Sequence, residues 1–255
     1  MKDMRARLAP DLSPLHKVIL GWDYFHEGDF PPNSKETYAS VLNTFRTPND
    51  YQATFRPLLT LEAWQGFVKA REENPAKAYE VRIVSRASVD AFQEVSSTMT
   101  HNENRDIQIS EGDIVLLSRS DAPSAREPHC LARVFRVQRK QAHIEVSYRV
   151  TPASSLQSAL TPQNTVYGTK IQSITPLERE YGALLGLQYY DLCDEIIRAK
   201  PSPLLTYKQS QIEPLVDNYS LNKAQAKAVR SAIDNDAFTL IQGWVYYPNF
   251  DGSLH

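Results

Sequence analysis

The sequence predicts an α+β fold in which a small β-barrel is carried on an antiparallel two-helix stalk, with an irregular N-terminal arm before it and an incomplete α/β segment after it. Two changes in hydrophobic period support this interpretation. Apolar residues recur every three or four positions on both sides of the central region, which is typical of amphipathic helices. Within the central region the period is two, over several short segments separated by polar loops, which is typical of a small barrel or sandwich.

The first part of the chain contains the arm and the first stalk helix. Residues 1–50 are irregular, rich in aromatic side chains and interrupted by Pro31-Pro32. Such a stretch favours an arm that packs over other elements, because aromatic side chains bury large areas. Residues 51–76 carry an apolar stripe at helical spacing, and Asn74-Pro75 ends this helix.

Residues 77–174 are expected to form the barrel, and residues 175–202 the second stalk helix. The segment from Thr175 to Glu178 has the sequence of a capping box with proline at the first helical position, which is a strong start signal. Because each helix has one apolar stripe, the simplest arrangement is an antiparallel pair with the stripes facing each other. The residues that we expect to be buried together are Leu61, Trp64, Leu185 and Leu192.

The composition is that of an ordinary globular chain. Its 255 residues are 42% hydrophobic and 23% charged, enough for one large domain or two smaller ones. The net charge is -2, so nucleic-acid binding would need a local basic patch. Two cysteines, Cys130 and Cys193, are too few for a disulfide framework or a Cys-rich zinc site, and we expect no metal. We find no signal peptide and no membrane-spanning stretch, and predict an intracellular protein.

Residues 203–243 contain a helix followed by a short apolar strand. Asn222 can cap the helix, and Gln225 can reach back to it as in a capping box. The expected strand, Phe238 to Ile241, leads to Gly243, and this order is that of the approach to a phosphate-binding loop. Bulky aromatic residues follow Gly243, however, and they cannot wrap a backbone closely around a phosphate.

Five segments carry a resemblance to a known family. Leu221-Asn222-x-x-Gln225 followed by Leu240 to Gly243 resembles the adenine-reading glutamine motif and the first loop residue of superfamily-one RNA/DNA helicases. The order of arm, stalk helix, barrel and stalk helix is similar to the senataxin-like branch, over residues 17 to 243. The segments similar to that branch in particular are Gly21 to Tyr24, Leu59 to Trp64 and Glu111 to Val115.

The resemblance implies a role for each part. The barrel and stalk would be an accessory insertion on the first RecA-like motor domain, and residues 203–243 would begin that domain. Asn222, Gln225 and Gly243 would be the vestige of its nucleotide-binding site. The parent helicases use ATP and magnesium to unwind nucleic acid in the nucleus, in transcription termination and in the removal of RNA–DNA hybrids, so RNA or DNA is the implied partner.

The sequence departs from the family at residue 244. The family continues with Gly-Pro-Pro-Gly-Thr-Gly-Lys-Thr, whereas this chain has an unrelated tail over residues 244–255. Unrelated coding sequence, deliberate truncation and a real short isoform are the open explanations. Without the Walker lysine and threonine there is no phosphate clamp and no magnesium ligand. We therefore expect an N-terminal helicase part truncated at the Walker A loop, with no catalytic residue, no bound cofactor and no ATPase activity.

A stand-alone barrel that binds nucleic acid or protein is the alternative function. Basic residues lie on and after one expected strand, and a basic barrel face beside aromatic residues can follow a phosphate backbone. The other interpretation is a solvated strand face. Strict alternation does not place these residues on one face, because Arg136 differs in parity from two of the others. The candidate residues are Arg133, Arg136, Arg139 and Lys140, with His143 and Arg149 on the next strand.

Overall fold

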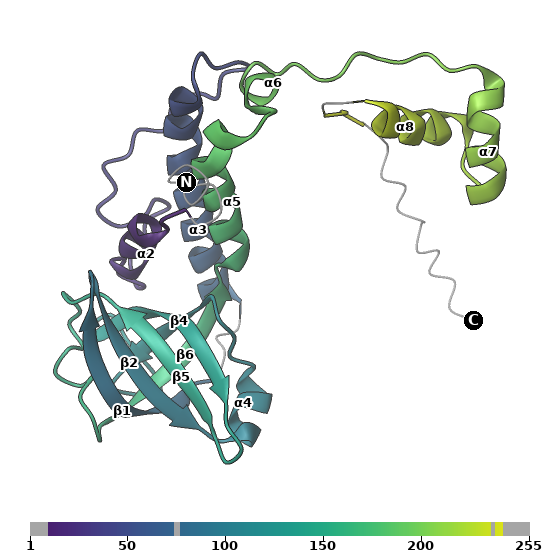
Figure 1. Cartoon of the computed structure of the whole chain (residues 1–255). Coiled ribbons are helices and arrows are strands. Elements are labelled where there is room, and N and C mark those ends of the chain that lie inside the picture. The colour runs from purple at the N-terminus through teal and green to yellow at the C-terminus, as the bar shows by residue number, and fades with distance from the viewer. Residues whose placement is uncertain (1–9, 74–76, 236–237, 242–255) are drawn as a thin grey trace, which may run out of the picture. The chain divides into compact units, whose positions relative to one another are not determined.

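The computed structural model describes residues 10–73, 77–235 and 238–241 (Figure 1). The chain divides into two compact units. The first consists of residues 1–41 and 49–189, and the second of residues 42–48 and 190–255. No helix in the described ranges is long and apolar enough to cross a membrane.

A closed six-stranded antiparallel β-barrel forms the centre of the first unit. Its strands follow one another around the barrel in the order β1-β2-β5-β4-β3-β6, and a short helix, α4 (His101–Ile107), follows β2. The interior is filled by inward-facing aliphatic side chains and by Tyr79 and Tyr148, whose hydroxyls lie 3.3 Å apart. The strands are β1 (Tyr79–Val89), β2 (Phe92–Met99), β3 (Asp113–Ser118), β4 (His129–Arg139), β5 (Ile144–Val150) and β6 (Thr165–Ser173).

The predicted barrel is present, but strand β2 was not among the strands predicted from the sequence. Its inward positions alternate polar and apolar residues, with Gln93 and Ser97 among the buried side chains. Such a strand has only a weak period of two in hydrophobicity. The backbone of β2 pairs with both β1 and β5, and the Ser97 hydroxyl donates to the Val146 carbonyl at 3.5 Å.

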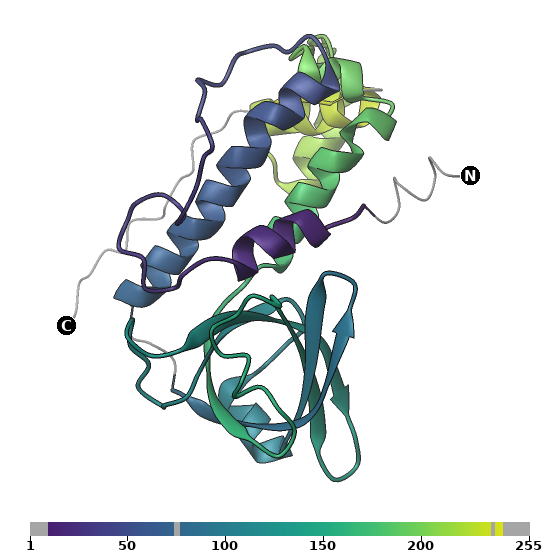
Figure 2. The same cartoon turned by 90° about the vertical axis from the view of Figure 1, so that its left-hand side faces the viewer.

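Three helices cover one end of the barrel: α2 (Ser13–Leu20), α3 (Pro48–Glu72) and α5 (Thr175–Gly186) (Figures 1 and 2). Helices α3 and α5 run in opposite directions, as expected for the stalk. At their far ends the Gln52 side chain donates to the Leu184 carbonyl at 2.9 Å. At the barrel end the Gln172 side chain donates to the Ala63 carbonyl at 3.3 Å.

The two stalk helices do not bury their apolar faces only against each other, as we had expected. Trp64 is fully buried, but Leu61 and Leu185 are only half-buried, and Leu192 lies in the second unit. Helix α2, the arm and the outer face of the barrel contribute to the same apolar cluster as α3 and α5. The expectation failed because an arm without clear periodicity supplies much of the packing surface.

The expected continuous helix over residues 175–202 is also wrong. Helix α5 ends at Gly186, a 3₁₀ turn, η1 (Leu187–Tyr189), follows, and α6 (Cys193–Ile197) is separate. Gly186, the last residue of α5, is a poor helix former and lies at the break. The capping box at Thr175 is absent as well: no side chain caps α5, and Glu178 turns toward the barrel instead.

The second unit contains α6, α7 (Gln209–Tyr219) and α8 (Lys223–Asp234). Helix α8 begins directly after the predicted cap residue Asn222, but the described residues Phe238 to Ile241 do not form the predicted strand. Leu240 and Ile241 are 73% and 61% exposed. A parallel strand needs neighbours and covered faces, and the described chain offers this segment neither. The structure therefore does not show the expected RecA-like start.

Candidate nucleic-acid interface

Strand β4 contains a β-bulge that changes the direction of its basic side chains. Val134 pairs with Tyr148 and Arg136 pairs with Ser147, so Phe135 is an extra residue between them. Tyr148 and Val134 point into the barrel, whereas Ser147 and Arg136 point outward. The bulge therefore places Arg136 on the outer face, where Arg133 also lies, although strict alternation had assigned them opposite faces.

The Glu111-Gly112 turn supports this bulge. The Val137 amide donates to the Glu111 carboxylate at 3.1 Å, and the Gly112 amide donates to the Val134 carbonyl at 2.8 Å. Gly112 has a φ of 86°, and a Cβ there would come within 2.1 Å of the Thr175 hydroxyl. Only glycine fits this position without strain. One of the segments that resemble the helicase family thus shapes the outer face of the barrel.

Three of the four predicted basic residues are exposed. Arg136 lies at the bulge, and Arg139 and Lys140 lie where β4 ends. The Lys140 ammonium is 3.7 Å from the Glu145 carboxylate, with both side chains nearly half exposed, so this pair leaves Lys140 largely free for other partners. A role of these three residues in phosphate contact stays a prediction.

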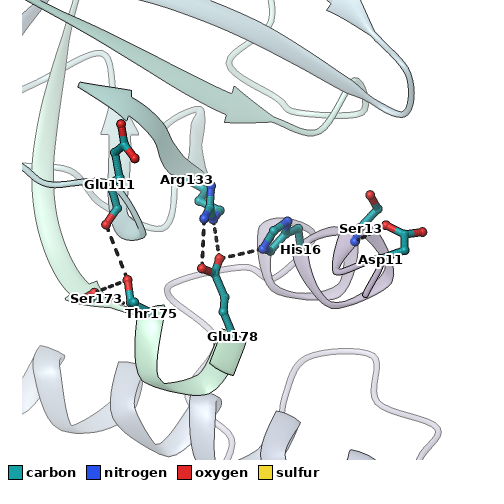
Figure 3. A network of polar contacts seen from close by, with 8 residues as sticks. All are labelled: Asp11, Ser13, His16, Glu111, Arg133, Ser173, Thr175 and Glu178. Carbon is teal, nitrogen blue, oxygen red and sulfur yellow. Dashed lines mark hydrogen bonds and ion pairs between the residues drawn. The ribbon is translucent and has the colours of Figure 1, made fainter. Parts of the chain in front are cut away.

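Arg133 is engaged inside the protein (Figure 3). Its guanidinium donates two hydrogen bonds to the Glu178 carboxylate, at 2.5 and 3.0 Å, and the His16 ring lies 2.7 Å from the same carboxylate. The exposed fractions of the Arg133 and Glu178 side chains are only 14% and 12%. A phosphate would have to displace Glu178 from Arg133, so Arg133 is not available as a surface contact.

This network joins three elements that are far apart in the sequence: α2 through His16, β4 through Arg133 and α5 through Glu178 (Figure 3). Burial alone would raise the pKa of Glu178, but the hydrogen bonds and positive charges of His16 and Arg133 outweigh burial and lower it. The carboxylate is thus ionised at neutral pH and holds the arm, the barrel and the stalk at one point.

The arm is held to helix α3 by side chains that donate to arm carbonyls. Arg71 donates to the carbonyls of Tyr24 and His26 at 2.9 and 2.7 Å. The Trp64 indole donates to the Gly28 carbonyl at 2.9 Å. These bonds satisfy the backbone of a segment that has no regular secondary structure of its own.

The three helicase-like segments in the first unit meet in one apolar cluster. Trp22 packs edge-to-face against Trp64, with ring centroids 5.4 Å apart, and Ile114 on β3 belongs to the same cluster. Residues around positions 22, 64 and 114 therefore come together although they lie on the arm, the stalk and the barrel. The cluster fixes the barrel to the stalk.

The predicted nucleotide-binding residues form a reciprocal cap at the start of α8. The backbone amide of Gln225 donates to the Asn222 side-chain oxygen at 2.9 Å, and the backbone amide of Asn222 donates to the Gln225 side-chain oxygen at 3.0 Å. Both residues are exposed. Gly243 lies outside the described residues, so adenine recognition by these three residues stays a prediction.

No metal centre is formed by the residues that the structure describes. Within these ranges no three His, Cys, Asp or Glu side chains gather as metal ligands. Cys130 is buried, and burial raises the pKa of its thiol to about 11. A thiol of this kind is protonated and unreactive at neutral pH.

Residues 74–171, which span most of the barrel, match the family model of the helicase SEN1 beta-barrel domain. The chain is also 33% identical over 256 residues to helicase SEN1 of Saccharomyces cerevisiae, covering 95% of this chain and 12% of that protein. This chain is a homologue of part of the Sen1 helicases. The senataxin-like resemblance found in the sequence is thereby confirmed.

Two further Sen1-like relatives agree with this assignment. Helicase sen1 of Schizosaccharomyces pombe is 26% identical over 245 residues, covering 94% of this chain and 14% of the relative. A probable helicase, MAGATAMA 3 of Arabidopsis thaliana, is 23% identical over 270 residues, covering 92% of this chain and 33% of the relative. The chain therefore spans between 12% and 33% of the length of these relatives.

Proposed function

We propose that this chain supplies the barrel and stalk of a Sen1-like helicase acting in the nucleus, and that its barrel holds a single strand of nucleic acid. The observation that carries the proposal is the meeting of the three helicase-like segments in one cluster around Trp22, Trp64 and Ile114. An accessory domain can guide a strand only if it is fixed in position. The Arg133–Glu178–His16 network and this cluster provide that rigidity.

Nucleic-acid contact is supported by the exposed cations at the bulge and the end of β4. Arg136, Arg139 and Lys140 are exposed along one strand and its end, although the register places Arg136 opposite the outward Ser147 and Arg139 opposite the inward Ile144. Their contribution is local, since the whole chain has a net charge of -2.

ATP hydrolysis is not part of the proposed activity of this chain. The described residues do not fit an ATP–magnesium site: Asn222 and Gln225 cap a helix and are exposed, and the sequence has no Walker lysine. Parent helicases would supply hydrolysis from their own phosphate-binding loop.

A single experiment tests the proposal: fluorescence anisotropy with a short single-stranded RNA over a salt series, with ATP turnover measured in parallel. We expect the logarithm of the binding constant to fall with the logarithm of salt with a slope of about -2, as expected for three cations on a single strand. Turnover should stay at background. The matched control carries Arg136→Gln, Arg139→Gln and Lys140→Gln, and should lose most of the salt dependence.

Two outcomes would contradict the proposal. RNA-stimulated turnover that is lost in Gln225→Ala would show a working nucleotide site. Absence of salt-dependent RNA binding would remove the nucleic-acid role of the barrel.

A further inference from the structure

An aromatic ring and two guanidinium groups are stacked on the outer face of the barrel, where β2, β5 and β4 lie side by side. The guanidinium carbon of Arg149 on β5 lies 4.6 Å from the centroid of the Phe135 ring. Arg136 approaches the same ring at 5.8 Å. Both contacts exist because the bulge turns Phe135 and Arg136 outward together.

The Arg149 guanidinium is held in place before any ligand binds. Its Nε and Nη2 atoms donate to one carboxylate oxygen of Glu94 on the neighbouring strand, at 3.0 and 2.8 Å. The side chain still has 31% of its surface exposed. Strands β2 and β5 have no helix drawn across them in the front view (Figure 1). The ring of the buried Phe92 also lies 5.9 Å from the Arg149 guanidinium carbon, so the planar cation is fixed beside two rings and is partly exposed.

The two arginines on the Phe135 ring differ in whether a carboxylate compensates their charge. Arg149 is paired with Glu94, so its charge is largely compensated and its planar face is the feature it offers. Arg136 has no carboxylate within ion-pair distance among the described residues, and it is exposed. The two arginines on Phe135 therefore offer a planar surface and an uncompensated cation next to each other.

We propose that Arg149, held over Phe135 by Glu94, is a stacking platform for one base of a single-stranded nucleic acid, with Arg136 binding the adjoining phosphate. The inference rests on the proposed function and names its contact site. Arginine guanidinium planes and aromatic rings are the groups on which unpaired bases stack. The bases of a duplex are already stacked and paired, so the platform selects single strands. A stacking face beside an uncompensated cation offers the two groups that a base and its phosphate need, whereas an apolar protein surface would have no use for the cation.

The test compares two strands and two conservative variants. Arg149→Lys keeps the charge but loses the plane, and Phe135→Leu keeps an apolar side chain but loses the ring. Binding of each variant to a short oligouridine and to an abasic strand of equal length is measured by fluorescence anisotropy. We expect both variants to bind oligouridine more weakly on the order of tenfold, and to bind the abasic strand as the unaltered chain does.

The matched control is Arg82→Lys. Arg82 is an exposed arginine on β1 that is also paired with a glutamate, Glu80, and neither affinity should change. Thermal melting shows that each variant is folded. If Arg149→Lys weakens both strands equally or neither, the platform is wrong while strand binding by the barrel stands. If the unaltered chain binds neither strand, both the platform and the proposed nucleic-acid role are wrong.

Discussion

Replacing Trp64 with alanine should lower the free energy of unfolding by about 3–5 kcal/mol, as truncation of a buried large aromatic side chain does. Trp64 is 0% exposed, packs against the rings of Trp22 and Phe67, and donates to the Gly28 carbonyl. The variant loses the ring packing and leaves an arm carbonyl without its donor. Urea denaturation followed by circular dichroism measures the change.

Tyr219→Ala is the control for aromatic truncation. Tyr219 is 68% exposed on α7, and its removal should change stability by less than about 0.5 kcal/mol. Trp64→Phe keeps an aromatic ring but removes the donor and part of the indole volume, and should lower stability by less than Trp64→Ala does, by about 1–3 kcal/mol. A loss below about 1 kcal/mol for Trp64→Ala would mean that the cluster does not hold the arm, stalk and barrel together.

Glu178→Gln should lower the free energy of unfolding by about 2 kcal/mol at pH 7, because Arg133 is left nearly buried without a counter-ion. The effect should depend on pH. The folded state lowers the pKa of Glu178, so its stabilisation is fully present above the ordinary glutamate pKa of about 4.3 and is lost as pH falls through the lower folded value. Denaturation at pH 7 and at several values below pH 5 measures this.

The difference between the unaltered chain and Glu178→Gln should therefore shrink on acidification. Other carboxylates, such as Glu103 with its pKa lowered by the Thr100 backbone, titrate in both proteins and cancel in this difference. Glu145→Gln is the matched control, since Glu145 pairs with Lys140 at the surface and its loss should matter by less than about 0.5 kcal/mol. If the difference in the free energy of unfolding did not change with pH, Glu178 would stabilise the fold by packing and not by its charge.

Local patterns in the sequence predicted the barrel, the start of the second stalk helix and the cap of α8, whereas α3 begins at Pro48, three residues before the predicted start. Each depends on residues within a few positions of one another: alternation in β5, Pro176 at the start of α5, and Asn222 with Gln225. Strand β2 was not predicted because its inward residues include the polar Gln93 and Ser97, which weaken the period of two in hydrophobicity.

The candidate site was harder to predict because its geometry is non-local. The bulge on β4 depends on Glu111, whose carboxylate accepts a hydrogen bond from the Val137 amide, 26 positions further along the chain. The engagement of Arg133 depends on Glu178 and His16 on other elements, whereas the sequence alone suggested a local cap for Glu178. Arg149 and Phe135 had been placed on neighbouring strands, but only the extra residue in β4 brings ring and guanidinium together.

Native-state hydrogen exchange tests most directly the central claim that the arm, the stalk and the barrel form one cooperative unit. We expect the protected amides of α2, α3 and β3 to exchange with one common free energy of opening, equal to that of global unfolding. Residues 238–241 should exchange much faster, since Leu240 and Ile241 are exposed and lie outside any strand. If α2 exchanges well ahead of β3, or if residues 238–241 are as slow as β3, the claim is contradicted.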